Sequence, residues 1–258
     1  MWEEELEVAK ELAEKAGKKI MEFYHGSFDV TIKGDESPVT SADFASNQII
    51  INGLREKFPT FAILSEEIAD DLSRLNNDYV WIIDPLDGTQ DFVEHGSGFA
   101  VNIALAYKHE LVVGVVYVPV TDELYFASIG KGSYYQKDGK ASKIHVNNKI
   151  DNLTCLISIH FFNEIEKETI EKHRDRITNY YPAGASLKPC LIARGVAEIS
   201  YRLSSSTKEW DTAAPQIILE EAGGLVRKID GTTITYNRED VHNREWYMWM
   251  NREENFLL

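Results

Sequence analysis

The chain has 258 residues, 43% of them hydrophobic and 27% charged, so it is long enough to bury roughly three quarters of its unfolded surface in one large domain or two. This composition excludes a disordered chain and a small protein held together by disulfides. The formal net charge of −15 argues against binding nucleic acid or an anionic membrane through a basic face, and we expect neither as a partner.

The first 60 residues show two helical patterns. Apolar residues recur at helical spacing over residues 6–23, and this stripe stops near Gly26. A second pattern covers residues 43–58 and is closed by Pro59. Asp43 therefore lies where a helix starts, and by itself it is a first-turn acid that favours the helix dipole.

Two short apolar runs, each followed by acids, predict two strands. The run at 62–64 leads to Glu66, which either completes a metal site, orients a metal-bound water as general base, or belongs to a solvated turn. The run at 80–83 has the β-branched and aromatic character of an interior strand. We expect Asp84 and Pro85 to end it, because proline cannot donate to the ladder and biases the preceding residue.

The residues that follow this second strand predict a metal and phosphate site. Asp84 and Asp87 lie three positions apart on a tight turn and can converge on one hard cation, with the Leu86 carbonyl as a third oxygen of the kind that Mg²⁺ accepts. Gly88 and Thr89 then open a predicted helix, whose free N–H groups favour a phosphate. This pairing indicates phosphate-ester chemistry. The alternative is an Asp-rich turn that caps a helix, because short motifs often match by chance.

The rest of the chain predicts a meander followed by alternating strands and helices. Strand-like runs separated by short turns lie at 99–106, 111–117, 124–127 and 132–135, and Asp138-Gly139 is a hairpin signal before 144–146. Further on, we expect strands at 154–159 and 197–201 and helices at 164–173, 187–194 and 210–222. The predicted fold class is therefore an α+β part over residues 1–150 and an α/β part over residues 151–258, layered in one compact unit.

Asp211 stands at the start of the last predicted helix, where it suits an N-cap as well as it suits a metal ligand. The aromatic run at 246–249 is read either as a terminal core strand or, together with Trp2, as part of an interface. We therefore expect a monomer or a homodimer.

The cysteines and the N-terminus indicate a cytoplasmic protein. Cys155 and Cys190 are far apart in the sequence and not in a metal-binding spacing, which fits reduced, buried thiols. The N-terminus lacks the basic start and apolar core of a secretion signal. No apolar run approaches the ~20 residues that span a bilayer.

Four motifs are separated along the chain: Pro-Val-Thr-Ser-Ala-Asp at 38–43, Ser-Glu-Glu at 65–67, Asp-Pro-Leu-Asp-Gly-Thr at 84–89 and Trp-Asp-Thr-Ala-Ala at 210–214. In this order and spacing the chain resembles the inositol monophosphatase superfamily of Mg²⁺-dependent, lithium-sensitive phosphatases, over nearly its whole length. The resemblance implies a five-layer α-β-α-β-α sandwich.

The same resemblance implies a site that holds two or three Mg²⁺ ions and hydrolyses a phosphate ester with a metal-activated water. The implied metal ligands are Glu66, Asp84, the Leu86 carbonyl, Asp87 and Asp211. Glu66 and Thr89 would orient the water, and Asp43 would bind a third, weaker metal or its waters. The phosphate would rest on the backbone N–H groups of Gly88 and Thr89.

Four further segments, at 37–40, 101–105, 184–190 and 201–202, are similar to one branch of this superfamily, the 3′(2′),5′-bisphosphate nucleotidases. That branch removes the 3′-phosphate of 3′-phosphoadenosine 5′-phosphate, which would place this chain in sulfur metabolism. The chain departs from the branch in two places: Ala185 stands where the branch usually has a serine, and Gln90-Asp91 replaces the usual Lys-Glu. The loop at 204–206 is also serine-rich and slightly longer than the pattern.

For this branch, Ser186, Lys188 and Arg202 would hold the second phosphate, and the resemblance implies that His160 contacts the adenosine. Lys188 suits a solvated surface position equally well, and a lone histidine is more often structural. The rival functions are inositol-1-phosphate or fructose-1,6-bisphosphate hydrolysis, a glycosidase that uses Glu66 with a distant Asp, and a non-catalytic metal- or anion-binding protein.

Overall fold

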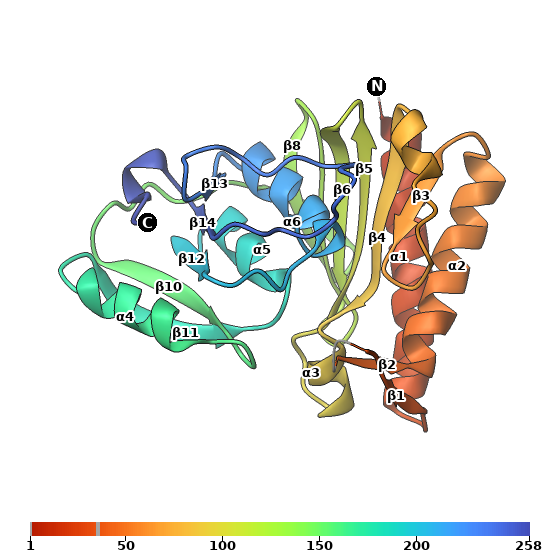
Figure 1. Cartoon of the computed structure of the whole chain (residues 1–258), viewed down its shortest axis with the longest axis horizontal. Coiled ribbons are helices and arrows are strands. Elements are labelled where there is room, and N and C mark those ends of the chain that lie inside the picture. Colours follow the sequence, from red (N-terminus) through yellow and green to blue (C-terminus); the bar gives the residue numbers. More distant parts are fainter. Residues whose placement is uncertain (1, 35–36) are drawn as a thin grey trace.

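The structure is a computed structural model that describes residues 2–34 and 37–258. A layer of helices separates the seven-stranded sheet from the five-stranded sheet, and further helices lie on the outer sides of these two sheets (Figure 1). The helices are α1 (Glu3–Tyr24), α2 (Ser41–Lys57), α3 (Thr89–Val93), α4 (Glu164–Lys172), α5 (Leu187–Ala193) and α6 (Glu209–Glu221). From one side to the other the layers are α1 with α2, the larger sheet, α5 with α6, the smaller sheet, and α4, so the predicted five-layer sandwich is confirmed.

The larger sheet has seven strands in the order β3-β4-β5-β6-β7-β8-β9. They are β3 (Ala62–Ser65), β4 (Tyr79–Asp87), β5 (Ala100–Tyr107), β6 (Glu110–Val118), β7 (Glu123–Ser128), β8 (Gly132–Lys137) and β9 (Lys140–Ile144). β3 and β4 are parallel, and every later neighbour is antiparallel, which confirms the predicted meander. Asp138 and Gly139 both have positive φ in the two-residue turn between β8 and β9, as an Asp-Gly hairpin requires.

The prediction that Asp84 and Pro85 end the strand was wrong. β4 continues to Asp87, with a shift of register against β5: Asp84 pairs with Asn102, and Asp87 pairs with Ala100. Three steps on β4 thus face two steps on β5, which is a bulge of one residue. The bulge accommodates the missing proline N–H, so the chain bends at the acids without leaving the sheet.

The smaller sheet has five strands in the order β11-β10-β12-β14-β13. They are β10 (Leu153–Ser158), β11 (Ile177–Ala183), β12 (Ile199–Arg202), β13 (Leu225–Lys228) and β14 (Tyr247–Met250). β13 and β11 were not predicted from the sequence. β11 is an edge strand with residues 178–182 all exposed, so it lacks apolar alternation. β14 is buried along its whole length, so the interface interpretation of residues 247–249 was wrong and the core-strand interpretation was right.

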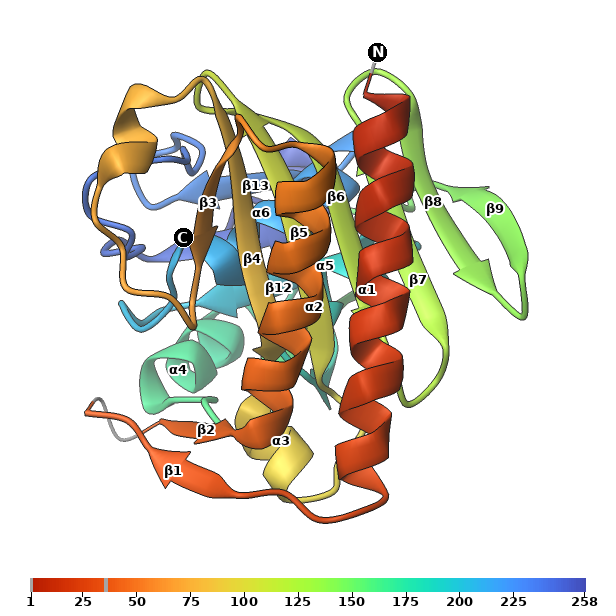
Figure 2. The same cartoon turned by 90° about the vertical axis from the view of Figure 1, so that its right-hand side faces the viewer.

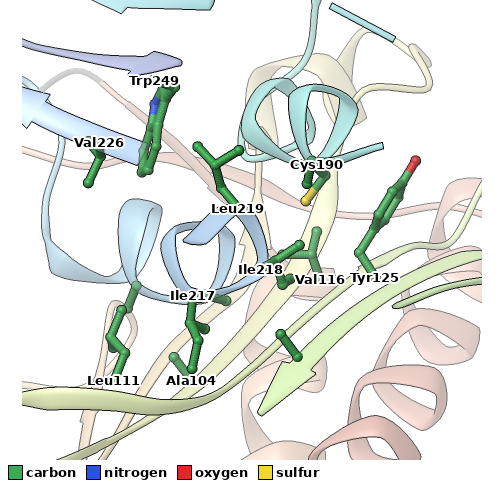
Figure 3. Packing of buried hydrophobic residues seen from close by; sticks show 14 of the residues in the cluster. Ala104, Leu111, Val116, Tyr125, Cys190, Ile217, Ile218, Leu219, Val226 and Trp249 are labelled. Carbon is green, nitrogen blue, oxygen red and sulfur yellow. The ribbon is translucent and has the colours of Figure 1, made fainter. Parts of the chain in front are cut away.

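Helices pack tightly on both faces of the seven-stranded sheet. α1 and α2 cover its outer face (Figure 2), and α6 lies against its inner face. Ile217, Ile218 and Leu219 of α6 are buried between this sheet and Trp249 of the smaller sheet (Figure 3). A Cβ at Gly114 of β6 would lie 2.3 Å from Cγ2 of Ile217, so α6 approaches β6 as closely as only glycine permits. This contact fixes the helix that carries Asp211.

A short antiparallel hairpin, β1 (Val30–Ile32) with β2 (Pro38–Thr40), lies beside α3 at one end of the larger sheet (Figure 2) and was not predicted. Within residues 2–34 and 37–258, no helix combines the length and the apolar character that crossing a bilayer requires.

Candidate active site

A cavity of about 500 Å³ opens where the end of β4 meets residues from the ends of β10 and β12 and from the starts of α5 and α6. Its volume lies in the range of pockets that bind small molecules. The cavity is lined by all the site residues predicted from the sequence apart from Asp43: Glu66, Asp84, Leu86, Asp87, Gly88, Thr89, His160, Ser186, Lys188, Arg202 and Asp211. The fold therefore brings together residues from both halves of the sequence.

Three carboxylates form the centre of the site. Asp84 and Asp87 of β4 and Asp211 of α6 each offer an oxygen, and these three oxygens lie within 4.8 Å of one another. Asp84 is 1% exposed, so its charge cannot be screened by bulk water. Closely grouped carboxylates, with the Leu86 carbonyl beside them, are the donor set that hard divalent cations prefer. The residues present thus fit a metal site.

The electrostatics of this group favour a bound cation. Burial raises the pKa of Asp84, and the nearby carboxylates of Glu66, Asp87 and Asp211 raise it further. Burial, with Asp87 and Glu66, also raises the pKa of Asp211 to about 8. The pKa of Asp87 is raised by burial as well, against hydrogen bonds from Ser186 that lower it. Like charges at this spacing are costly without a counter-charge, which a divalent cation supplies.

Asp87 also links the larger sheet to the start of α5. Its Oδ2 accepts the backbone N–H of Ser186 at 2.8 Å and the side-chain amide of Asn102 at 3.2 Å. The Ser186 hydroxyl donates to Oδ1 of Asn102 at 2.9 Å. Beside this contact, a Cβ at Gly184 would lie 2.1 Å from the carbonyl oxygen of Gly98, so the two backbones touch. Both polar groups of Ser186 thus support Asp87, and its contact with substrate stays a prediction.

Asp43 and Thr89 form a pair next to the three acids. Asp43 occupies the third position of α2, as a first-turn acid, and its Oδ2 accepts the backbone N–H and the hydroxyl of Thr40. The Thr89 hydroxyl lies 3.1 Å from Oδ1 of Asp43 and 3.1 Å from the Leu86 carbonyl oxygen. Burial raises the pKa of Asp43 to about 6, although the bonds from Thr40 lower it. Thr89 is therefore held between a carboxylate and the carbonyl predicted as a ligand.

Lys33 contacts the site through Glu66 and was not predicted from the sequence. Its ammonium donates to Glu66 at 2.9 Å and to Glu67 at 2.6 Å. Burial lowers the pKa of Lys33, but the two glutamates outweigh this and raise it above its usual range. Glu66 stands outside the group of three acids, and its role as a metal ligand stays a prediction. No short-range signal marks Lys33, because its partners are 33 and 34 positions away.

Asp211 is not the N-cap of α6, as one interpretation of the sequence had it. Lys208 is the N-cap, and Asp211 at the third position accepts the backbone N–H of Lys208. The helix starts earlier than predicted because residues from a later segment hold its entry: Lys208 forms a β-bridge with His242, and the Asn243 N–H donates to the Thr207 carbonyl. The Asp211 carboxylate is thus positioned by Lys208, which the later segment at 242–243 holds in place.

Lys188 and Arg202 are two of the cationic side chains that line the same cavity. Lys188 is 8% exposed and donates to the Ala185 carbonyl at 3.1 Å, so its interpretation as a solvated surface residue was wrong. Burial and the nearby Arg202 lower the pKa of Lys188 to about 8. The Arg202 guanidinium donates to the Ser206 hydroxyl at 2.6 Å and lies 3.5 Å from the Ser158 hydroxyl. The serine-rich loop therefore holds one end of Arg202.

His160 lies just beyond β10 and faces carboxylates of the other sequence half. Its Nε2 is 3.5 Å from Oδ1 of Asp91, and its Nδ1 is 3.9 Å from Oε2 of Glu94. Asp91 is buried and accepts the backbone N–H of Gly98. Asp91 thus links α3 to His160. It is one of the residues at which the chain departs from the nucleotidase pattern.

Comparison with known proteins decides the family. Residues 1–255 match the model of the Inositol monophosphatase family. This chain belongs to that family. It is 36% identical over 242 residues to the 3′(2′),5′-bisphosphate nucleotidase CysQ of Salmonella typhimurium, covering 92% of this chain and 96% of that protein. It is also 36% identical over 237 residues to CysQ of Escherichia coli K12, covering 90% and 94%.

Solved structures of inositol monophosphatase family members share the fold. The crystal structure of CysQ from Bacteroides thetaiotaomicron has a TM-score of 0.83 and 33% identity, covering 98% of this chain and 99% of that one. An IMPase of Thermotoga maritima has a TM-score of 0.81 and 25% identity, covering 96% and 92%.

Membership of the inositol monophosphatase family settles the class of chemistry. The chain is a phosphatase that acts on small phosphate esters, and the family is metal-dependent, in agreement with the group of three acids. The glycosidase interpretation is therefore overturned.

Proposed function

We propose that this chain is a Mg²⁺-dependent 3′(2′),5′-bisphosphate nucleotidase that removes the 3′-phosphate of 3′-phosphoadenosine 5′-phosphate. The observation that carries the proposal is one cavity that holds both the three acids and the cationic side chains of Lys188 and Arg202. A monophosphate needs an anion site only where the metal lies. A second cationic site in the same cavity suits a substrate with a second phosphate, as the names of the CysQ relatives imply.

The metal site we propose uses Asp84, Asp87 and Asp211, with Glu66 and the Leu86 carbonyl as further ligands. When bound there, two Mg²⁺ ions would neutralise charge on the phosphate and lower the pKa of the attacking water. A third ion would bind more weakly near Asp43. Asp84 is buried, which strengthens the electrostatic contacts that its carboxylate makes.

The protein's own groups position the attack. The Thr89 hydroxyl donates a hydrogen bond to the Asp43 carboxylate, 3.1 Å away. Its oxygen is then placed to accept a hydrogen bond from the attacking water. Glu66 orients the same water from the other strand end. The phosphate rests on the backbone N–H groups of Gly88 and Thr89, where the chain turns from β4 into α3.

The second phosphate is assigned to Lys188 and Arg202. An arginine fork held by Ser206 and Ser158 and a compact ammonium suit a phosphate dianion. Because the pKa of Lys188 is lowered to about 8 without a ligand, a bound dianion would hold this side chain in its charged form. We further propose a cytoplasmic monomer or homodimer, in keeping with two buried, free cysteines, Cys155 and Cys190.

Phosphate release tests the proposal directly. We would compare 3′-phosphoadenosine 5′-phosphate, inositol-1-phosphate and fructose-1,6-bisphosphate, each with Mg²⁺ and with EDTA. We expect Mg²⁺-dependent release that is at least ten-fold faster, as kcat/KM, from the nucleotide. Preference for either other substrate would leave the metal site in place and refute the nucleotidase assignment.

A further inference from the structure

The rim of the cavity next to β10 carries apolar side chains that the mechanism does not use. Phe161 is 62% exposed and Ile159 is 43% exposed, and both line the cavity. They stand on either side of His160 in the loop that follows β10. Large apolar side chains gathered at the lining of a ligand cavity are a mark of a binding surface rather than of ordinary exposure.

The ring of Phe161 is held by its neighbours in the site. The central carbon of the Arg202 guanidinium lies over the ring, 5.5 Å from its centre. The His160 ring meets it edge-on, with ring centres 6.4 Å apart and planes at 75°. Since Arg202 is itself bonded to Ser206, the ring is fixed from one face, and its large exposed area is left for a ligand.

We propose that Phe161 is a stacking platform for the nucleobase of the substrate, and therefore a specificity-determining residue. This inference rests on the proposed function and deepens it. Arg202, assigned to the second phosphate, touches the Phe161 ring, so a ligand that bridges the three acids and Arg202 carries its remaining part along this rim. An aromatic face stacks with any base and favours purines, because they offer more area.

The position of Phe161 also predicts which kinetic constant depends on it. The ring lies beside Arg202, and no contact links it to Asp84, Asp87 or Asp211 among the interactions of the described residues. A base stacked there is held equally before and during the attack on the 3′-phosphate. Loss of the stack should therefore raise KM for the nucleotide and leave kcat nearly unchanged.

The test uses Phe161→Leu in the full-length, Mg²⁺-loaded protein. We expect KM for 3′-phosphoadenosine 5′-phosphate to rise about ten-fold, and KM for a base-free methyl riboside 3,5-bisphosphate to stay unchanged. Phe161→Trp keeps an aromatic face, so its KM for the nucleotide should equal that of the unchanged protein. Tyr181→Leu is the control, because Tyr181 is an aromatic residue on β11 with 37% exposure that lies outside the cavity lining.

Calorimetric binding of the product adenosine 5′-phosphate and of its base-free analogue ribose 5-phosphate gives a readout without turnover. Adenosine 5′-phosphate should bind Phe161→Leu about ten-fold more weakly than the unchanged protein, while ribose 5-phosphate should bind both equally. Equal losses for ligands with and without a base, or no loss for either, would overturn the inference while nucleotide hydrolysis by the unchanged protein keeps the proposed function. Failure of the unchanged protein to hydrolyse the nucleotide would overturn both.

Discussion

Two clusters of opposite charge line one cavity. The acidic end consists of Asp84 and Asp87 of β4 with Asp211, and the cationic wall consists of Lys188 of α5 and Arg202 of β12. At the acidic end, carboxylates crowd together and the pKa of Asp211 rises to about 8. At the cationic wall, burial and Arg202 lower the pKa of Lys188 to about 8. Each cluster is destabilised by its own like charges and by burial, so each is prepared for a ligand of opposite sign.

The largest expected effect comes from removing one charge at the acidic end. Asp87→Asn should lower kcat by at least 10²–10³-fold, on the order expected for loss of a group that stabilises the transition state. The protein should stay folded, because an asparagine oxygen can still accept the Ser186 N–H that Asp87 accepts at 2.8 Å. Phosphate release and a thermal melt would measure the two effects.

A matched control for this variant lies outside the residues that line the cavity. Asp122→Asn changes an aspartate in the turn between β6 and β7, whose carboxylate accepts the Tyr117 hydroxyl at 2.8 Å. It should leave turnover unchanged. An Asp87→Asn protein with most of its activity would remove Asp87 from the metal site and end the contrast between the two clusters.

The next effect tests the cationic wall. Lys188→Met keeps the apolar stem and removes the charge, so KM for 3′-phosphoadenosine 5′-phosphate should rise roughly 10- to 100-fold, as for a hydrogen bond to a charged group. KM for inositol-1-phosphate should change less than about three-fold, because that substrate has no second phosphate. Lys143→Met on the exposed strand β9 is the control. Equal rises for the two substrates would show that Lys188 serves the reacting phosphate or the fold instead.

The same contrast governs how far the sequence could predict each region. The acids at the end of β4 lie in one short motif with local rules, so the sequence could predict that the carboxylates of Asp84 and Asp87 lie close together. The proline rule correctly located an irregularity at Pro85, but a bulge absorbed it and β4 continued. Asp211 was predicted at the right helix but at the wrong cap position, because a distant segment containing His242 sets where that helix begins.

Residues that depend on long-range contacts were harder to predict. Lys33 was missed because its glutamate partners are more than thirty positions away. β11 was missed because an edge strand exposed at residues 178–182 has no buried face to produce alternation. Phe161 was not singled out, because the sequence does not distinguish an exposed phenylalanine from a buried one. Lys188 was predicted by motif, but its burial could be known only from the packing around α5.

The smallest effect is a pH dependence that sharpens the comparison between the two clusters. The pKa values of Asp43, about 6, and Asp211, about 8, lie above the ordinary aspartate value near 3.8. Between pH 3.8 and pH 8 the unfolded chain binds fewer protons than the folded one. The metal-free protein should therefore lose stability as pH rises from 5.5 to 8. Mg²⁺ requires deprotonated ligands, so its stabilising effect should grow over the same interval.

Thermal melts with EDTA and with saturating Mg²⁺, at steps from pH 5.5 to pH 8, would measure this. We expect the gap in Tm between the two conditions to widen by several degrees, since about 1 kcal/mol shifts Tm by roughly 2–4 °C in a chain of this size. Asp211→Asn in EDTA should show a shallower fall, because it removes a group whose pKa in the folded protein is about 8. Lys188 works in the opposite direction only above its pKa of about 8, where its buried charge is lost, so the range stops there. A Tm gap that stays constant with pH would mean that the carboxylates of the acidic end are already charged without a metal. Burial alone, and not a shift of pKa, would then distinguish the two clusters.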